Sequence, residues 1–214
     1  FNLEMSAEQL ANRILQSLGQ ISGIKMRTGR LEHNDWKRLN EAISRISDTN
    51  LFLDDTPGIT IGEIRSKCRR LANSEKGLGL VVIDYLQLIT GPSKTIGNRQ
   101  QEVSEISRSL KTMALELGVP VIALAQLSRA VEQREDKRPI MSDLRESGSI
   151  EQDADIVSFL YRDDYYNQES RRDDNSSITE FIIGKNRSGP TTTIELLFRK
   201  DTSTFVNFKR ESGE

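Results

Sequence analysis

The sequence contains little of the chemistry that marks several common classes of protein. It has one cysteine, Cys68, and one histidine, His33, among 214 residues. A single cysteine excludes an internal disulfide framework, and a histidine without a cysteine or histidine partner argues against a zinc site of the usual kind. No apolar run approaches the roughly 20 residues needed to span a bilayer, and no signal-peptide pattern opens the chain. We therefore expect a cytoplasmic protein with no membrane partner.

Neither sign of charge predominates. The chain has 30 Lys and Arg and 32 Asp and Glu, which gives a net charge of −2. This balance argues against a uniformly basic protein that coats nucleic acid, but it allows binding through a local basic patch. The chain begins at Phe1 rather than Met, and its first four residues resemble the end of a strand. We expect it to be a fragment of a longer protein.

Hydrophobic periodicity predicts the order of the elements. Helices are expected over about 6–18, 35–47, 60–73 and 98–117, because apolar residues recur there at three and four positions. Apolar runs predict strands at 51–53, 79–83, 119–125, 155–161, 178–185, 192–198 and 204–208, and residues 162–177 are expected to form a solvated loop. Helices alternate with buried strands early and hairpins come late, so residues 1–214 are predicted to be one α/β domain with a parallel sheet and an antiparallel extension.

The most informative segment is Leu80-Val81-Val82-Ile83 followed by Asp84. A continuous apolar run of this kind is typical of a strand that is covered on both faces of a parallel sheet. Ligands of such sheets gather at the carboxyl ends of the strands, where Asp84 falls. Asp84 can hold Mg²⁺ there, or it can simply cap the following turn.

Three apolar runs end in a polar residue: Glu4, Asp84 and Gln126. If these runs are neighbouring parallel strands, the three side chains emerge at one edge of the sheet. Such an edge would combine a carboxylate that activates water, a carboxylate for a metal ion and an amide that senses a phosphate.

Two further segments carry groups suited to phosphate. Lys185 and Arg187 lie at the end of a predicted strand, where they can stabilise phosphate charge or form a solvated basic tip. Arg145 and Gly148, in a charged stretch, can bind a phosphate backbone through a guanidinium and close backbone approach. An ordinary loop stabilised by salt bridges is the alternative for the second segment.

These segments together resemble the ATPase domain of the replicative DNA helicases of the DnaB family. The resemblance rests on motifs that occur in order along the whole chain: Phe1-Asn2-Leu3-Glu4-Met5, Val82-Ile83-Asp84-Tyr85-Leu86-Gln87-Leu88, Asn98-Arg99-Gln100-Gln101-Glu102-Val103, Leu124-Ala125-Gln126-Leu127-Ser128-Arg129, Asp136-Lys137-Arg138-Pro139, the run from Arg145 to Asp155, and Gly184-Lys185-Asn186-Arg187-Ser188-Gly189-Pro190. It implies a RecA-like nucleotide-hydrolysing core.

The resemblance also implies a role for each matching residue. Glu4 would activate the attacking water, Asp84 would bind magnesium, and Gln126 would couple the γ-phosphate to the DNA-binding loops. Lys185 and Arg187 would project into the ATP site of a neighbouring subunit. Arg13 matches a position that packs on the nucleotide base, and Arg145, Glu146 and Gly148 match a loop that follows single-stranded DNA. The loop over 91–101 would be a second channel loop.

As a member of this family the protein would use ATP and Mg²⁺, form a homohexamer, translocate on single-stranded DNA and unwind duplex DNA. Primase and a helicase loader would be partners of the full-length protein. One departure matters: the Gly-x-x-x-x-Gly-Lys-[Ser/Thr] motif that cradles phosphates is absent. In the family this motif lies upstream of Glu4, so we expect the fragment to begin after it and to be inactive alone.

Three other functions remain as alternatives. A RecA-type recombinase has the same fold, but the segment from Arg145 to Asp155 argues against it. A non-catalytic scaffold or loader-binding module that has lost the phosphate-binding motif is the second. An unrelated metal-dependent hydrolase would need another metal ligand beside Asp84, and the three residues that follow Asp84 do not supply one.

Overall fold

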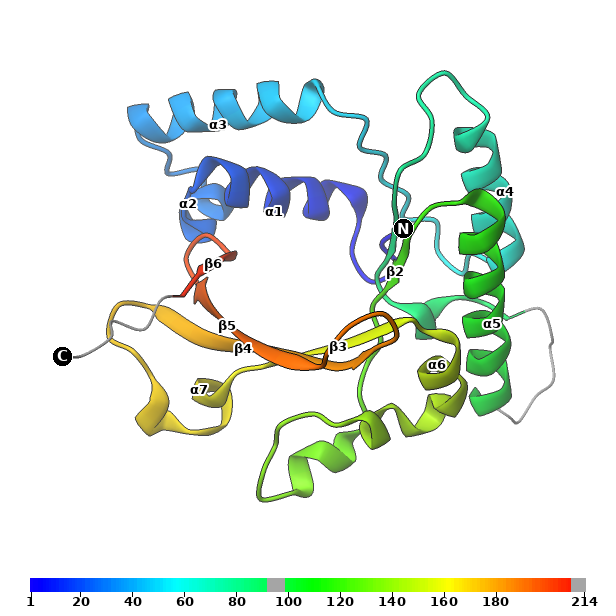
Figure 1. The fold of residues 1–214 in the computed structure, drawn as a ribbon. Coiled ribbons are helices and arrows are strands. Elements are labelled where there is room, and N and C mark those ends of the chain that lie inside the picture. Colours follow the sequence, from blue (N-terminus) through cyan, green and yellow to red (C-terminus); the bar gives the residue numbers. More distant parts are fainter. Residues whose placement is uncertain (92–98, 209–214) are drawn as a thin grey trace. The chain divides into compact units, whose positions relative to one another are not determined.

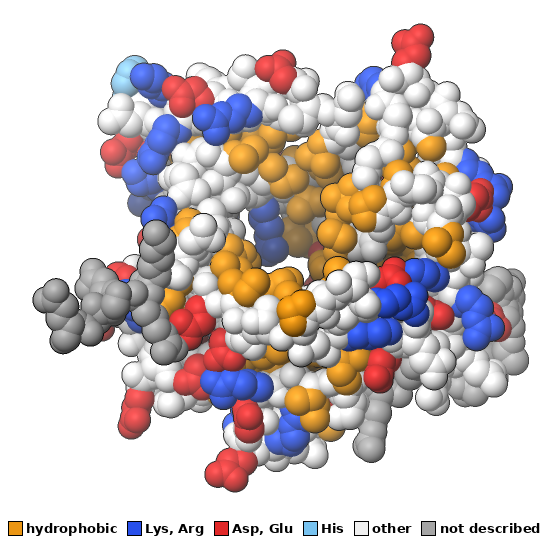
Figure 2. Space-filling model, in the orientation of Figure 1, with side chains coloured by type: hydrophobic (Ala, Val, Ile, Leu, Met, Phe, Trp, Pro, Cys, Tyr) orange, Lys and Arg blue, Asp and Glu red, His pale blue; other side chains and the backbone are white. Residues whose placement is uncertain are grey.

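The fold was analysed in a computed structural model that describes residues 1–91 and 99–208, without the side chains of 145–148. The chain divides into two compact units, each of which is described by itself. The first unit contains Phe1–Ala7 and Phe52–Val157, and the second contains Glu8–Leu51 and Ser158–Glu214. In the described ranges, no helix is long and apolar enough to cross a membrane. Acidic and basic side chains are interspersed over the visible surface (Figure 2), as the small net charge leads one to expect.

Parallel strands form the centre of the first unit. Strand β1 (Val81–Ile83) pairs in parallel with β2 (Val121–Ala123), and Val81 lies opposite Val121. The first residues of the chain extend this sheet on the other side of β1. Asn2 forms a parallel bridge with Asp84, and the Leu3 N–H donates to the Asp84 carbonyl at 2.7 Å. The strand order is therefore residues 1–3, β1, β2.

Two helices cover one face of β1. Helices α4 (Ile61–Ala72) and α5 (Arg99–Leu117) lie side by side in Figure 1 and contact each other. Their inward apolar side chains form one core with Val81 and Ile83. Val82, between these two, is 43% exposed. The prediction that this strand is covered on both faces is therefore wrong for the described residues, because the helices pack on the Val81 and Ile83 face.

Short helical segments complete the first unit. The 3-10 helices are η1 (Leu86–Leu88), η2 (Arg129–Gln133) and η3 (Met141–Ser147), and η3 leads directly into α6 (Gly148–Asp153). The charged stretch between β2 and the next strand is therefore largely helical. Sequence periodicity did not reveal these turns because each is too short to repeat a pattern.

The second unit combines helices with an antiparallel sheet. Its helices are α1 (Ala7–Gly19), α2 (Gly23–Thr28), α3 (His33–Ser47), α7 (Asp163–Tyr166) and the 3-10 helix η4 (Gln168–Ser170). Its strands are β3 (Ile156–Tyr161), whose first two residues belong to the first unit, β4 (Ser176–Asn186), β5 (Thr192–Arg199) and β6 (Thr204–Asn207), adjacent in that order. The pairs β4–β5 and β5–β6 are antiparallel, which confirms the predicted hairpins.

Two local predictions differ from the structure. Residues 51–53 form no strand, although the adjoining Asp54 carbonyl accepts a hydrogen bond from the Asn2 N–H at 2.9 Å. The segment 162–177 is not simply a solvated loop, because Asp164 on α7 is buried and bound by Arg162 and Lys200. The ion pairs compensate the cost of burying this charge, and composition alone does not reveal such pairing.

Candidate nucleotide-binding edge

The carboxyl edge of the parallel sheet carries the three polar residues that end the apolar runs. Asp84 follows β1 directly, Glu4 lies two residues beyond the Asn2–Asp84 bridge, and Gln126 lies three residues after β2. Since the three segments are neighbours and run parallel, all three residues lie at the same edge. The structure thus provides the arrangement on which the predicted site depends.

The three side chains differ in exposure. Glu4 and Gln126 are exposed, and Asp84 is half-buried. The Asp84 N–H donates to the Phe1 carbonyl at 2.9 Å, which fixes the backbone at the point where the carboxylate leaves the sheet. The Asp84–Tyr85 peptide bond is cis. A half-buried carboxylate between two solvent-accessible polar side chains suits a polar ligand that carries its own metal ion.

Gln87 is a residue of this edge that the sequence interpretation missed. Its side-chain Nε2 donates to the Gln126 carbonyl at 3.1 Å, and its Oε1 accepts from the Gln126 N–H at 3.3 Å. The amide therefore binds both main-chain groups of one residue and holds the end of β2 beside the turn after β1. The available signal was a single polar residue between Leu86 and Leu88, which does not by itself indicate its partner.

A further set of contacts continues from Gln87 to the start of α5. The Arg99 guanidinium donates to the Gln87 carbonyl and also binds the Glu102 carboxylate. Glu102 Oε1 accepts from the Gly91 N–H at 2.9 Å, and a Cβ at Gly91 would collide with the Glu102 side chain. The hydrogen bond from Gly91 and the contact with Arg99 hold the pKa of Glu102 below its ordinary value. These contacts connect the edge to both ends of the predicted channel loop, whose residues 92–98 lie outside the described ranges.

The predicted basic groups of the second unit lie on two elements. Arg13 is exposed on α1. Lys185 is half-buried near the end of β4, and Arg187 is exposed in the turn that follows. Asn186 holds this turn, because its Oδ1 accepts from the Ser188 N–H at 3.2 Å and its Nδ2 donates to the Pro190 carbonyl at 3.3 Å. Arg187 is therefore displayed by an ordered hairpin.

The predicted DNA-binding residues lie where η3 joins α6. Arg145 and Glu146 belong to η3, and Gly148 begins α6. Their side chains lie outside the described residues. The backbone just before them is anchored, since Asp143 and Leu144 are both buried.

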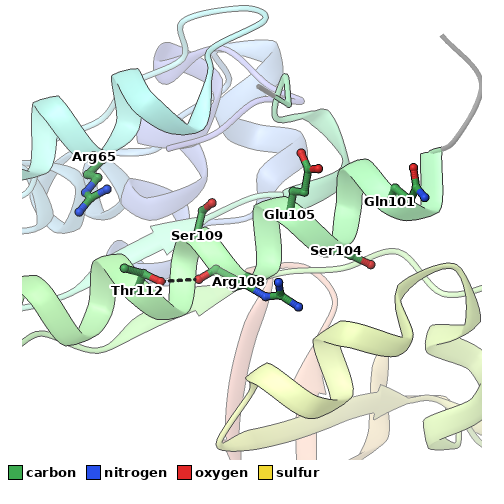
Figure 3. A pocket seen from close by; sticks show the side chains of 7 residues that line it. All are labelled: Arg65, Gln101, Ser104, Glu105, Arg108, Ser109 and Thr112. Atoms are coloured by element: carbon green, nitrogen blue, oxygen red, sulfur yellow. Dashed lines mark hydrogen bonds between the residues drawn. The ribbon is translucent and has the colours of Figure 1, made fainter. Parts of the chain in front are cut away.

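A separate open groove of about 670 Å³ lies along α4 and α5. Polar and charged side chains line it (Figure 3): Arg65, Gln101, Ser104, Glu105, Arg108, Ser109 and Thr112. Gln101 is the last residue of the predicted channel loop, and none of the residues predicted individually to bind nucleotide, magnesium or DNA is among them. In the described part of the chain there is also no group of three or more His, Cys, Asp or Glu side chains that could hold a metal ion. The carboxyl edge of the sheet, where three of the predicted residues lie, is the stronger candidate site.

Comparison with known proteins shows which family this chain resembles in sequence. The chain matches the model of the DnaB-like helicase C-terminal domain over residues 1–207. It is 58% identical over all of its length to the replicative DNA helicase DnaB of Geobacillus stearothermophilus, covering 46% of that protein. It is 59% identical over 98% of its length to the replicative DNA helicase DnaC of Bacillus subtilis (strain 168), covering 45% of that protein. The chain thus spans about half the length of these relatives.

Solved structures agree with this result. A solved ATPase domain superposes with a TM-score of 0.90 at 45% identity, over 97% of this chain and 73% of that one. A structure of a DnaB-like replicative helicase and its interactions with primase gives a TM-score of 0.90 at 46% identity, over 97% of this chain and 49% of that one. The fold is therefore that of DnaB-like ATPase domains, as predicted. By sequence and by structure, the chain belongs to the DnaB-like helicase C-terminal domain family.

Proposed function

We propose that residues 1–214 act as the motor domain of a hexameric replicative DNA helicase, which couples ATP hydrolysis to translocation on single-stranded DNA and to duplex unwinding. This proposal rests on one observation: Glu4, Asp84 and Gln126 all lie at the same edge of a parallel sheet. The family match over residues 1–207 supports it. Such a protein would act in the cytoplasm, and primase and a helicase loader are the proposed partners of the full-length protein.

The residues of the edge suit nucleotide hydrolysis. Nucleotide-bound Mg²⁺ takes few protein carboxylates and completes its shell with phosphate oxygens and water, which fits a single half-buried Asp84. When bound, the ion would neutralise charge on the phosphates. Glu4 would accept a proton from the attacking water, and Gln126, fixed by Gln87, would contact the γ-phosphate. Lys185 and Arg187 would stabilise phosphate charge in a neighbouring subunit, and Arg13 would pack on the nucleotide base.

The proposed DNA contacts lie in the same unit as this edge. Arg145, Glu146 and Gly148 would bind the phosphate backbone of single-stranded DNA, where an arginine and close backbone approach provide affinity without base recognition. Only a few cationic groups per subunit are needed when several subunits surround one strand. The net charge of −2 is consistent with this arrangement.

The test is Glu4→Gln in the full-length protein. The substitution keeps the size of the side chain but removes the proton acceptor, so we expect turnover stimulated by single-stranded DNA to fall by about 100-fold or more. ATP affinity, measured by titration with a fluorescent analogue, should change little because the ground-state contacts remain. Glu8→Gln, at an exposed position on α1, is the matched control and should retain wild-type turnover.

Two results would contradict the proposal. Equal hydrolysis by Glu4→Gln and wild type would remove Glu4 as the general base. A wild-type protein that binds single-stranded DNA but never hydrolyses ATP would instead favour a scaffold without catalysis.

A further inference from the structure

An ion pair between the half-buried Arg134 and the buried Asp143 lies, along the chain, between the nucleotide edge and the proposed DNA loop. Asp143 is 5% exposed. The Arg134 guanidinium donates to both oxygens of this carboxylate: Nη1 donates to Oδ1 and Nη2 donates to Oδ2, each at 2.9 Å. The Ile140 N–H donates to the same carboxylate at 2.8 Å. Paired bonds of this kind fix the orientation of both side chains as well as their distance.

Arg134 also orders the loop between the two partners. Its Nε donates to the Asp136 carbonyl at 3.2 Å, and its Nη2 donates to the Arg138 carbonyl at 2.7 Å. The Asp143 N–H closes the loop on the Ile140 carbonyl at 2.9 Å. We call Arg134, Asp143 and these backbone groups the 134–143 clamp. One guanidinium thus contacts groups along the whole segment and holds them together.

The clamp is tied to the nucleotide edge by a main-chain hydrogen bond. The Ser128 N–H donates to the Asp143 carbonyl at 3.0 Å. Ser128 lies two residues after Gln126, and Asp143 lies two residues before Arg145. A movement of Gln126 therefore reaches the backbone that precedes Arg145 through one hydrogen bond and a residue whose side chain is locked. Contiguous networks of this kind can carry energetic coupling between two sites.

From this geometry we propose that Arg134 and Asp143 are positioning residues that couple the nucleotide state at Gln126 to DNA binding by residues 145–148. The proposal rests on the proposed function, because it takes the nucleotide and DNA roles of these two segments from there. Arg134 and Asp143 are proposed to act through protein contacts rather than by binding nucleotide or DNA themselves. They would hold the segment that follows Gln126 in a fixed position relative to the segment that precedes Arg145.

The test uses Asp143→Asn and Arg134→Lys in the full-length protein. The Asn side chain has only one oxygen, so it cannot accept both hydrogen bonds from the guanidinium. Lys keeps the positive charge but lacks the planar group that donates to two oxygens at once. Affinity for single-stranded DNA is measured in ADP and in a non-hydrolysable ATP analogue. The quantity compared is the ratio of the higher of these two affinities to the lower. We expect each substitution to reduce this ratio by about fivefold or more, a typical size for allosteric coupling. Stimulation of turnover by DNA should fall with it, while turnover without DNA stays within about twofold.

Asp164→Asn is the matched control. Asp164 is also 5% exposed and paired with an arginine, Arg162, but it belongs to the second unit. We expect this control to lower the unfolding midpoint and to keep the wild-type affinity ratio. A folded Arg134→Lys or Asp143→Asn protein with an unchanged ratio overturns the proposal, and so does an equal reduction in Asp164→Asn. If Asp143→Asn does not fold, Arg134→Lys decides.

Failure of the coupling is distinct from failure of the proposed function. Wild-type stimulation by DNA that survives both clamp substitutions refutes the coupling alone. Absence of DNA-stimulated turnover in the wild-type protein refutes the proposed function and, with it, the coupling.

Discussion

The side-chain amide of Gln87 holds the main chain of Gln126, the residue proposed to contact the γ-phosphate. Its two hydrogen bonds to the main chain of Gln126 are at 3.1 and 3.3 Å. A hydrogen bond of this type contributes about 1 kcal/mol net, so Gln87→Ala should lower the free energy of unfolding by about 1–2 kcal/mol. We also expect slower ATP turnover, because the end of β2 is no longer held at the edge. Urea unfolding and steady-state ATPase assays of the full-length protein measure the two effects.

A double-substitution cycle separates the positioning role from general damage. If Gln87 acts through Gln126, the turnover of Gln87→Ala/Gln126→Ala should equal that of Gln126→Ala alone. Gln168→Ala, at an exposed position on η4, is the control for loss of a glutamine side chain. Fully additive losses in the cycle would show that Gln87 does not act through Gln126.

Residues of the proposed site could be suggested from the sequence where each stands at the end of an apolar run. Glu4, Asp84 and Gln126 could be found in this way because the run and its polar end are local features. Gln87 and Asp143 could not, since each depends on a partner outside its own short segment: Gln126 lies 39 residues from Gln87, and Arg134 lies 9 residues from Asp143. Local patterns contain no information on such pairing.

At the scale of elements, α3 shows that apolar periodicity can locate a helix without identifying all of its buried residues. The apolar positions Trp36 and Ile43 are exposed, whereas Asp35 is only 2% exposed. Lys25 Nζ lies 2.9 Å from Asp35 Oδ2, and Arg38 Nη2 lies 2.5 Å from Asp35 Oδ1. This paired carboxylate is accommodated on the buried face together with Leu39 and Ala42.

The contribution of Asp35 at the start of α3 to the free energy of unfolding should therefore fall at acidic pH. Hydrogen bonds from Lys25, from the Glu32 backbone and from Arg38 lower the pKa of Asp35 to about 2, against about 3.9 in an unfolded chain. Because the folded pKa is the lower one, Asp35 contributes stability above about pH 4 and loses it as the pH falls towards about 2. We expect Asp35→Asn to unfold at lower urea than wild type at pH 6, with a gap that narrows by pH 3.

Glu41→Gln is the control for this pH dependence, because Glu41 is an exposed carboxylate on the same helix. Its unfolding midpoint should follow that of the wild type at every pH. A gap between Asp35→Asn and wild type that is the same at pH 6 and pH 3 would show that Asp35 makes no ionic contribution to folding.

At the scale of the molecule, the predicted site residues divide between the two units. Glu4, Asp84 and Gln126 belong to the first, and Arg13, Lys185 and Arg187 belong to the second. The alternation of helices and strands predicted the parallel and antiparallel pairing, but the division into units depends on contacts between distant segments, such as the pairing of residues 1–3 with β1. A division of this kind is compatible with sites completed by a neighbouring subunit.

Mixing two inactive variants tests whether Arg187 acts on the site of a neighbour. In Glu4→Gln the arginine is intact, and in Arg187→Ala the general base is intact. If the arginine acts between subunits, a co-expressed mixture purified through a different tag on each variant should regain activity. Random assembly would leave roughly one site in four with both groups. Steady-state ATPase activity in the presence of single-stranded DNA is the measurement.

The informative control is a mixture of Glu4→Gln with Asp84→Asn. Both substitutions affect groups at the same sheet edge of one chain, so a site that has both groups intact cannot arise from any arrangement of these two variants. This mixture should stay as inactive as its parents. If the mixture with Arg187→Ala also stays inactive although both tags are present in one assembly, Arg187 does not complete a neighbour's site. The hairpin that displays it would then serve its own chain, and the β4–β5 turn would lose its proposed role between subunits.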